Sequence, residues 1–430
     1  MSNQIKKVGV IGAGTMGAGI AGQVSNAGVE VWLLDLPSDG ENVNKLSNKG
    51  LERLKDPDMP GLMSEEAEKL INLGNTRDHF HELEDCDWVA EAVVERLDIK
   101  QALYRRLNDT CKESTIITSN TSTIPIKLLT EGMSSAFCER FAITHFFNPV
   151  RFMRLLELVR GELTKDDVIA TLYQFSEISL GKGVVSCSDT PGFLANRVGV
   201  FAIQCALHNA FDLKLSPTEA DAFFGRPLGL PKTGVFGLYD LIGIDLMADV
   251  VKSLVSILPE NDAFHKYSSP IGFMTNMITN GQTGNKNDKG FYKQDGDERK
   301  VINLSNGDYV THERLKTPLL DLAEKNGISV ILSDNSPYGL YIWRVLSETL
   351  CYAASLVPEV TEDLTQIDDA MKLGYNWVKG PFELLDEIGI EYFVDRLKTD
   401  GRDVPSFLLK SHSNKFYSGS ESGLSFLGID

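Results

Sequence analysis

The first part of the chain alternates short apolar runs with segments of helical periodicity. The runs at 8–11 and 29–34 are short and continuous, which is typical of strands buried on both faces of a sheet. Apolar positions between them follow a helical spacing that stops at Gly28. Similar strand-like runs return further along, at 87–95, 115–119 and 141–147. Strands that alternate with helices predict an α/β domain with a doubly wound, parallel sheet over residues 1–186.

One stretch of this domain does not fit a simple crossover between strands. Residues 40–82 are charged and helical in pattern, and the pattern is broken at Pro57 and Pro60. We therefore expect an inserted helical arm at about 40–82.

The second half of the chain is helical by pattern and contains an internal repeat. The stretch Gly237–Asp245 matches Glu383–Glu391, and at nearly the same offset Asn196-Arg197-Val198 aligns with Trp343-Arg344-Val345. Such a repeat indicates two copies of one helical unit. Because the second copy has Trp343 where the first has Asn196, we expect a degenerate copy that packs on the first. The predicted organisation has tandem all-α units at 187–280 and 334–410, a connecting segment at 281–333 and a linker-like tail at 411–430.

The composition narrows the classes of partner. The chain has 42 Lys and Arg against 60 Asp and Glu, a formal net charge of −18. That balance argues against a nucleic-acid binder and against binding to anionic membranes, because both need a basic face. The six cysteines are scattered without the spacing of a metal site, as expected of thiols in a reducing compartment. With no apolar leader and no run long enough to span a membrane, we expect a cytoplasmic protein.

A glycine-rich turn follows the first predicted strand. It reads Gly12-Ala13-Gly14-Thr15-Met16-Gly17 and leads directly into the first predicted helix. Gly12 permits the tight turn, Gly14 lets the backbone approach a pyrophosphate, and Gly17 lets the helix pack close to the strand. The helix N-terminus then offers N–H groups and a partial positive charge to the phosphates. This pattern predicts a dinucleotide site.

An acidic residue stands at the end of the second predicted strand. Asp35 follows Gly12 at close to the spacing of a carboxylate that binds a ribose hydroxyl pair. Because a carboxylate repels a 2′-phosphate, Asp35 favours NAD over NADP as the cofactor. The alternative is that Asp35 is only a turn residue at a strand end.

Polar residues lie at the ends of the later predicted strands, where ligands of doubly wound sheets bind. Among them is His145, and Glu157 follows it inside an apolar run. A carboxylate in an apolar strand is costly unless it is paired, and an imidazole is a natural partner. Such a pair would fix the tautomer of the imidazole and raise its basicity, as a general base needs. The alternatives are a hydrogen-bonded core histidine for His145 and the solvent face of an edge strand for Glu157.

Four separated motifs occur in a fixed order along the chain. They are Gly12-x-Gly14-x-Met16-Gly17, Ser119-Asn120-Thr121-Ser122, His145-Phe146-Phe147-Asn148-Pro149 and Asp189-Thr190-Pro191-Gly192-Phe193-Leu194-Ala195-Asn196-Arg197. Together they resemble the 3-hydroxyacyl-CoA dehydrogenase family, in particular the dehydrogenase part of multifunctional fatty-acid oxidation enzymes. The resemblance covers about residues 5–410. It implies a Rossmann-like domain and the NAD-dependent oxidation of an L-3-hydroxyacyl-CoA to the 3-oxoacyl-CoA in fatty-acid β-oxidation.

The resemblance also implies roles for single residues. His145 resembles the catalytic base and Glu157 its acidic partner. Ser122 and Asn196 resemble the groups that hydrogen-bond the substrate oxygen. The residues implied around the cofactor are Gly12, Gly14, Met16, Gly17, Asp35, Glu95, Lys100, Asn120 and Asn148.

Other interpretations stay open for three of these residues. The alternatives are that Ser122 caps a helix beginning near Ile124, that Asn196 is a buried helix amide, and that Lys100 is a solvated helix charge. The family's contacts to the acyl-CoA substrate do not carry over, and Lys49, Arg53 and Lys55 are only candidates.

The resemblance also implies a partner unit, and two other functions remain as alternatives. The multifunctional enzymes also have an enoyl-CoA hydratase unit, which would lie beyond residue 430 or on a separate chain. The rival functions are a noncatalytic NAD-binding protein and an NAD-linked dehydrogenase of a non-CoA hydroxy acid. A noncatalytic protein need not keep the proposed catalytic groups together, yet all four are present in this chain, namely His145, Glu157, Ser122 and Asn196.

Overall fold

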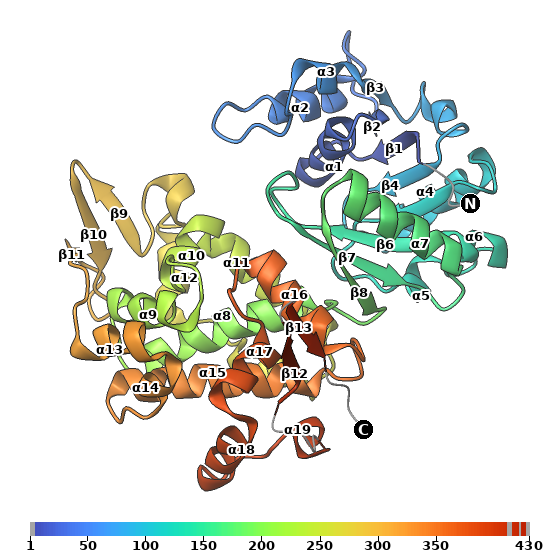
Figure 1. Cartoon of the computed structure of the whole chain (residues 1–430). Coiled ribbons are helices and arrows are strands. Elements are labelled where there is room, and N and C mark those ends of the chain that lie inside the picture. Colours follow the sequence, from blue (N-terminus) through green and yellow to red (C-terminus); the bar gives the residue numbers. More distant parts are fainter. Residues whose placement is uncertain (1–4, 411–414, 421–422, 427–430) are drawn as a thin grey trace. The chain divides into compact units, whose positions relative to one another are not determined.

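The computed structural model describes residues 5–410, 415–420 and 423–426 (Figure 1). It divides into two compact units, Met1–Phe193 and Leu194–Asp430. The division falls a few residues after the expected boundary at 186, because the last strand of the first unit runs on to Ser188. Each unit is described by itself.

The described part of the first unit is built on an eight-stranded sheet of order β3-β2-β1-β4-β5-β6-β7-β8. The strands β1 to β6 run parallel, β7 is antiparallel to β6, and β8 is parallel to β7. This arrangement confirms the predicted Rossmann-like fold class. The strands are β1 (Lys7–Ile11), β2 (Glu30–Asp35), β3 (Ile71–Asn75), β4 (Trp88–Glu91), β5 (Ile116–Ser119), β6 (Phe141–Phe146), β7 (Leu155–Arg160) and β8 (Gly183–Ser188).

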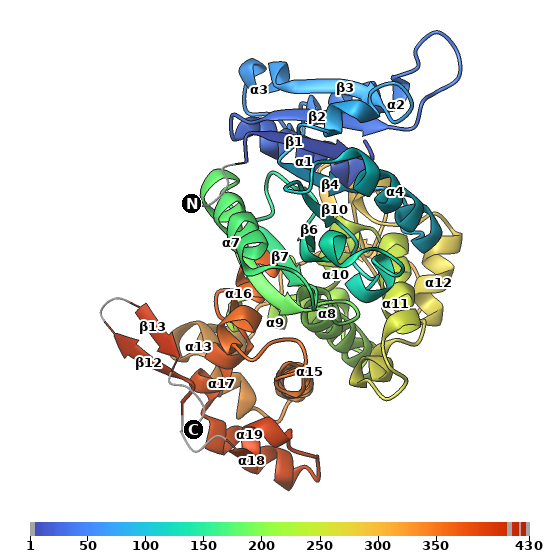
Figure 2. The ribbon, with the colours of Figure 1, turned by 90° about the vertical axis from the view of Figure 1, so that its right-hand side faces the viewer.

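Helices cover both faces of this sheet, so its central strands are apolar on both sides. The helices α1 (Thr15–Asn26) and α7 (Asp166–Gln174) pack on one face, against a cluster that includes the fully buried Val8, Val10 and Leu33. On the other face, Tyr104 of α4 (Leu97–Thr110) meets the rings of Phe137 and Phe141. Figure 2 shows α7 and α4 on opposite sides of the sheet. Each fully buried aliphatic side chain contributes about 1.5–3 kcal/mol relative to exposure.

The expected helical arm at 40–82 is only partly helical. It contains α2 (Lys45–Leu54) and α3 (Glu65–Lys69), but Ile71–Asn75 forms the edge strand β3, which pairs with β2. The prediction of a wholly helical insertion is therefore wrong. An edge strand has a neighbouring strand on one side only, so it need not be apolar throughout. The strand β3 carries Asn72, Gly74 and Asn75 and therefore lacks the apolar run of an inner strand. The short elements that complete this unit are η1 (Phe80–Leu83), α5 (Ile126–Leu129), α6 (Ser135–Glu139) and the π-helical turn η2 (Phe175–Ser179).

The second unit is mainly helical, and its two longest described helices pack against each other. These are α8 (Ala195–Asp212) and α15 (Pro337–Ser355), which lie side by side in Figure 1. The other helices are α9 (Pro217–Phe223), η3 (Arg226–Leu228), α10 (Phe236–Ile242), α11 (Ile244–Ile257), η4 (Ala263–Tyr267), α12 (Gly272–Thr279), η5 (Asn285–Asn287), α13 (Pro318–Asn326), α14 (Ile328–Leu332), α16 (Leu364–Tyr375), α17 (Pro381–Ile388), α18 (Ile390–Thr399) and α19 (Ser406–Lys410).

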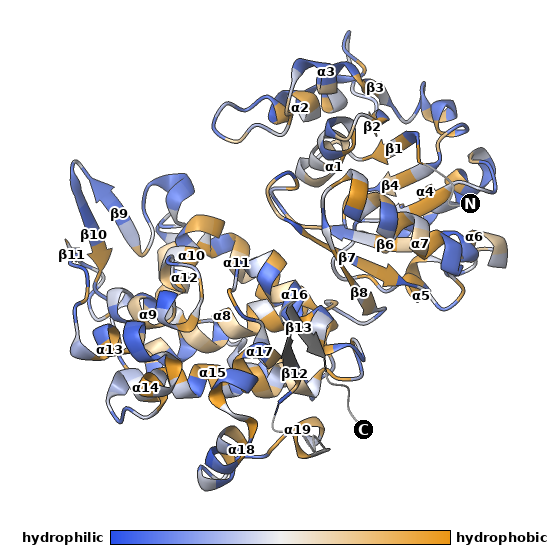
Figure 3. Cartoon of the chain, in the orientation of Figure 1, coloured by the Kyte–Doolittle hydropathy of each residue, from blue (hydrophilic) through white to orange (hydrophobic). Residues whose placement is uncertain are grey.

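Two small antiparallel sheets accompany these helices. One has the order β11-β10-β9, and the other is a hairpin of two strands. Figure 3 shows β9 as largely hydrophilic, in contrast to the hydrophobic strands β1 and β7 of the first unit. The strands are β9 (Tyr292–Asp295), β10 (Glu298–Ile302), β11 (Tyr309–Thr311), β12 (Tyr417–Ser420) and β13 (Gly423–Phe426).

The expected linker-like tail at 411–430 is ordered where it is described. Residues 411–414, 421–422 and 427–430 lie outside the described residues, whereas β12 and β13 pair as a hairpin. Phe416 and Tyr417 are buried, and their backbone N–H groups donate to the carboxylate of Asp386 at 2.7 and 2.9 Å. The linker prediction is therefore wrong for this segment, because a Phe-Tyr pair anchors it among Ser and Gly residues.

No helix in the described ranges combines the length and the apolar character that a membrane span requires.

Candidate active site

The glycine-rich turn has the backbone that a dinucleotide site needs. Gly12 has φ +99°, and a Cβ there would come within 2.4 Å of the carbonyl oxygen of Ala92. A Cβ on Gly17 would lie 1.7 Å from the carbonyl oxygen of Gly12, so helix and turn approach too closely for a side chain. A Cβ on Gly14, by contrast, would meet nothing within 4 Å. This open space at the N-terminus of α1 fits a pyrophosphate group.

Asp35 is tied to this turn. It ends β2, and its two carboxylate oxygens accept hydrogen bonds from the N–H groups of Ala13 and Leu36, both at 2.6 Å. The carboxylate is thus held beside the glycine turn, at the carboxyl end of the strand. Met16 is half-buried and packs on the core below α1, while Arg53 donates to the carbonyl oxygen of Ala13 at 2.9 Å.

Among the other arm candidates, Lys55 pairs with Glu68 at 2.5 Å, and Lys49 is exposed.

A buried carboxylate that the sequence analysis did not single out organises the next two strand ends. Glu91 ends β4 and is fully buried. It accepts hydrogen bonds from Lys100 Nζ at 2.6 Å, Tyr104 Oη at 2.5 Å and Ser119 Oγ at 2.7 Å. Burial and the charge of Glu91 raise the pKa of Tyr104 well above its usual value. The signal was present, since a carboxylate inside the apolar run 87–95 needs partners for the same reason as Glu157.

Lys100 is one of those partners and is not a solvated charge. Its side chain is buried between Glu91 and Glu95, with Nζ 3.1 Å from an oxygen of Glu95. Burial alone would raise the pKa of Glu95, but the charge of Lys100 and the hydrogen bond from Thr121 bring it below the ordinary value. The alternative of a solvated helix charge is therefore wrong.

Glu95 also fixes the loop that follows β5. Its carboxylate accepts hydrogen bonds from Thr121 Oγ1 and, at 3.3 Å, from the N–H of Ser122. The capping alternative for Ser122 is wrong: α5 begins at Ile126, and the hydroxyl that accepts the N–H of Ile124 belongs to Thr121. Ser122 is half-buried, and its hydroxyl makes no hydrogen bond to any residue that the structure describes.

Asn120 and Asn148 follow the ends of β5 and β6. The amide oxygen of Asn120 accepts the N–H of Phe146 at 2.9 Å, which ties the two strand ends together. Asn148 is exposed beyond the end of β6. Because β1, β2, β4, β5 and β6 are parallel, their carboxyl ends share one edge of the sheet.

His145 and Glu157 form a buried pair next to this edge. They are register partners on the antiparallel strands β6 and β7, and His145 Nδ1 lies 2.7 Å from Glu157 Oε2. Glu157 is fully buried on an inner strand, so its solvent-face alternative is wrong. The imidazole is bordered by the rings of Phe147 and Phe193, with centroids 4.5 and 5.8 Å away. A low-dielectric setting of this kind strengthens the interaction within the pair.

Asn196 belongs to the second unit, in the first turn of α8. It is half-buried, and its amide makes no hydrogen bond to a described residue. A structural amide inside a helix bundle would be satisfied, so Asn196 does not behave as the buried helix amide of the alternative interpretation.

Comparison with known proteins places this geometry in a family. A family model for "3-hydroxyacyl-CoA dehydrogenase, NAD binding domain" matches residues 7–190, and one for the "C-terminal domain" matches 192–294 and 339–415. The chain belongs to the 3-hydroxyacyl-CoA dehydrogenase family. The resemblance predicted from the four motifs is thereby confirmed, and so is the assignment of the first unit as an NAD-binding domain.

Relatives extend over most of the chain. A "Putative fatty acid oxidation complex trifunctional enzyme" from Rickettsia felis is 42% identical over 390 residues, which are 90% of this chain and 53% of that protein. A "Probable 3-hydroxyacyl-CoA dehydrogenase" from Deinococcus radiodurans is 39% identical over 297 residues, covering 69% of this chain and 85% of that one. The chain spans about half the length of the first of these relatives.

Among solved structures, a 3-hydroxybutyryl-CoA dehydrogenase from Escherichia coli shares the fold. Its TM-score is 0.70 at 24% identity, and the match covers 95% of this chain and 98% of that one.

Proposed function

We propose that this chain catalyses the NAD-linked oxidation of an L-3-hydroxyacyl-CoA to the 3-oxoacyl-CoA, and the reverse reaction. The observation that carries the proposal is the buried pair of His145 and Glu157, whose side chains meet at 2.7 Å on adjacent strands. Oxidation of a secondary alcohol near neutral pH needs a positioned base for the hydroxyl proton. An imidazole held by a carboxylate supplies that base.

Glu157 sets the state of the imidazole in this proposal. When its carboxylate accepts a hydrogen bond from the Nδ1–H group, the Nε2 atom of His145 carries a lone pair and can take the hydroxyl proton of the substrate. Glu157 then stabilises the imidazolium that forms. In the reverse direction, the same imidazolium returns the proton to the carbonyl oxygen.

Ser122 and Asn196 are the proposed hydrogen-bond partners of the substrate oxygen. Neither side chain is used by another described residue, so the Ser122 hydroxyl and the Asn196 amide are available to a ligand. Each would hold the oxygen in place while its single bond to carbon becomes a double bond. Such positioning of the reacting group lowers the barrier of the reaction.

The cofactor site rests on the fit of the glycine turn. Gly12, Gly14 and Gly17 leave room for a pyrophosphate, and Asp35 would hold the adenosine ribose. When bound, NAD accepts the hydride that leaves the substrate carbon. Four further residues at the strand ends would border it, namely Glu95, Lys100, Asn120 and Asn148. Met16 would support the turn from below.

A spectrophotometric assay tests the activity. Purified chain is mixed with NADH and either acetoacetyl-CoA or free acetoacetate, and the loss of NADH absorbance is followed. We expect rapid oxidation of NADH with the CoA ester and little with the free acid. Turnover with the free acid alone would point to a dehydrogenase of non-CoA hydroxy acids. NADH binding without turnover of either compound would point to a noncatalytic NAD-binding protein.

The wider setting is part of the same proposal. Since this chain aligns with only 53% of the length of two trifunctional relatives, we propose a hydratase unit beyond residue 430 or on a separate chain that supplies the hydroxyacyl-CoA. We also place the protein in the cytoplasm. Affinity purification of the native protein tests the first point, because a hydratase should co-purify with it or be found on the same polypeptide, and cell fractionation tests the second.

A further inference from the structure

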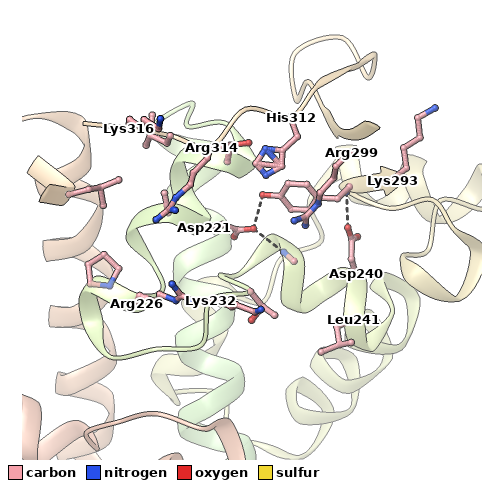
Figure 4. A pocket seen from close by; sticks show the side chains of 18 of the residues that line it. Asp221, Arg226, Lys232, Asp240, Leu241, Lys293, Arg299, His312, Arg314 and Lys316 are labelled. Atoms are coloured by element: carbon pink, nitrogen blue, oxygen red, sulfur yellow. Dashed lines mark hydrogen bonds between the residues drawn. The ribbon is translucent and has the colours of Figure 1, made fainter. Parts of the chain in front are cut away.

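A cavity lies within the second unit. The proposed dehydrogenase reaction gives no role to the residues that line it. The volume of the cavity is about 820 Å³, which is within the range of small-molecule sites. Its walls come from α9, η3 and α10 of the first helical copy, from β9 and β10, and from the segment between β11 and α13 (Figure 4).

Basic side chains gather around this cavity although the chain as a whole is acidic. Six Lys and Arg residues line it in a protein of net charge −18, and they come from three stretches of the chain, 226–232, 293–299 and 314–316. Figure 4 shows Lys293 pointing away from the others, while Arg299 and Arg314 reach inward. The six are Arg226, Lys232, Lys293, Arg299, Arg314 and Lys316.

Most of these cations have no carboxylate partner. Within the described ranges, Arg226, Lys232, Arg314 and Lys316 form no ion pair and no side-chain hydrogen bond. The guanidinium of Arg299 lies over the ring of Tyr292, 4.3 Å from its centroid. These side chains are exposed, so solvent screens their mutual repulsion, but together they make the potential around the cavity positive and favourable for an anion.

A histidine in the same wall also lacks a partner. The Nδ1 atom of His312 is buried and has no hydrogen-bond partner among the described residues, and its ring lies against Tyr292 with centroids 5.4 Å apart. Burial and the charge of Arg299 lower the pKa of His312. That atom is closed off even from the cavity, but other atoms of the ring line the cavity, so a bound ligand would change the surroundings of His312.

Four carboxylates also line the cavity, so its six cations leave only a small excess of positive charge. Asp221 accepts the N–H groups of Phe236 and Gly237 and the hydroxyl of Tyr292, and Asp240 accepts the N–H groups of Phe291 and Tyr292. Their oxygens are thus occupied by structural donors. Two further acidic residues, Asp321 and Glu324, are exposed on α13.

The second helical copy shows that the fold does not need such a cluster. Two lysines lie near its corresponding aspartate, Asp368, and both are paired. Lys372 meets Glu383 at 2.9 Å, and Lys379 meets Glu387 at 2.9 Å. The unpaired cations therefore occur in the first helical copy and in the connecting segment that follows it, and they are not a feature that the two copies share.

We propose that this cavity binds a small, multiply phosphorylated ligand, with Arg299, Arg314 and Lys316 holding its phosphates. Arg226 and Lys232 line the same cavity and add to its positive charge. Guanidinium and ammonium groups bind phosphate oxygens through charge-assisted hydrogen bonds, and several together select ligands with more than one phosphate. All of these residues belong to the second unit, whereas the glycine turn belongs to the first, and the proposal does not rest on the proposed dehydrogenase activity.

Isothermal titration of the full chain tests the proposal. The protein is first saturated with NADH, so that the pyrophosphate site at the glycine turn is filled, and inorganic tripolyphosphate is then titrated at low salt. We expect binding that weakens as salt is added. The double variant Arg314→Gln/Lys316→Gln should bind at least tenfold more weakly. The matched control Arg105→Gln/Lys325→Gln also loses two exposed charges, and we expect it to bind within twofold of wild type.

The outcomes separate a built site from general charge attraction. Equal weakening in the two double variants would overturn the proposal, and so would the absence of binding to the wild-type chain. A parallel titration with adenosine 3′,5′-bisphosphate distinguishes sources of the phosphates. Tighter binding than tripolyphosphate indicates a nucleotide ligand, and weaker binding indicates recognition of the phosphates alone. The His312 ring signals should shift in NMR spectra on binding, and unchanged signals would place the ligand elsewhere.

Discussion

The two helical copies of the second unit share a buried framework and differ in what they expose. In the first, Asp221 and Asp240 bind backbone N–H groups of α10 and of the Phe291-Tyr292 pair. In the second, Asp368 and Asp386 bind those of α17 and of the Phe416-Tyr417 pair. The tyrosine hydroxyl donates back to the first aspartate in each, at 2.8 and 2.7 Å.

The shared framework extends to the backbone. Gly243 joins α10 to α11 with φ +111°, and Gly389 joins α17 to α18 with φ +91°. Only glycine adopts such a conformation without strain. The aspartate hydrogen bonds and the glycine joints of the first copy therefore recur in the second.

The two copies differ in polar side chains that could bind a ligand. The first copy has Asn196 with a free amide, and the second has Trp343 at the aligned position, buried and donating Nε1–H to Asp400 at 2.6 Å. The first copy gathers unpaired cations, and the second pairs its lysines. Within the second unit, the duplicated buried polar networks therefore belong to the scaffold, whereas the polar groups without partners differ between the copies.

The largest predicted effect concerns the shared framework. Asp221→Ala and Asp368→Ala each leave two N–H groups and a tyrosine hydroxyl without an acceptor. We expect each to lower the free energy of unfolding by about 3 kcal/mol, measured by urea denaturation. If Asp368→Ala cost less than about 1 kcal/mol while Asp221→Ala cost the full amount, the two frameworks would not be equivalent.

The same aspartates predict a dependence of stability on pH. Burial raises the pKa of Asp221 and of Asp368 to about 7, far above the value of an unfolded aspartate. Between about pH 4 and 7 the folded state then binds more protons than the unfolded state, so stability falls as the pH rises through this range and levels off above it. We expect each of the two aspartates to contribute a loss of about 2 kcal/mol between pH 5 and 7, measured by thermal and urea unfolding. A stability that rises over this interval would contradict the assignment.

The smallest predicted effects come from replacing the two aligned residues, Asn196 and Trp343, and they test whether only the first copy serves catalysis. Asn196→Ala should lower kcat/KM for acetoacetyl-CoA about tenfold without changing the free energy of unfolding, because it removes the substrate contact that we propose for this amide. Trp343→Phe should leave kcat/KM unchanged and cost about 1 kcal/mol of stability, through the lost hydrogen bond to Asp400. Equal effects of the two substitutions on catalysis would remove the functional distinction between the copies.

Much of the fold could be predicted because burial leaves a clear pattern. Inner strands such as β1 and β6 are covered on both faces, so they read as apolar runs. The edge strand β3 and the hairpin β12–β13 escaped prediction because they are partly polar or rich in Ser and Gly. Their places depend on partners that are distant in the sequence.

The candidate site was predictable in part for a chemical reason. Glu157 stood out because a carboxylate in an apolar strand needs a partner, and the antiparallel register supplies His145. Glu91 obeys the same rule and was overlooked beside the stronger motif signals. The basic cavity was not predictable, because residues from 226 to 316 meet there only through the fold.

The central claim is that His145 is the general base, and replacing it tests the claim most directly. We expect His145→Gln to bind NADH within twofold of wild type and to lower kcat with acetoacetyl-CoA by about 10²–10⁴-fold, the usual contribution of a positioned base. The exposed His81→Gln serves as the matched control and should retain full activity. A His145→Gln protein whose kcat stays within a few fold of wild type would contradict the account.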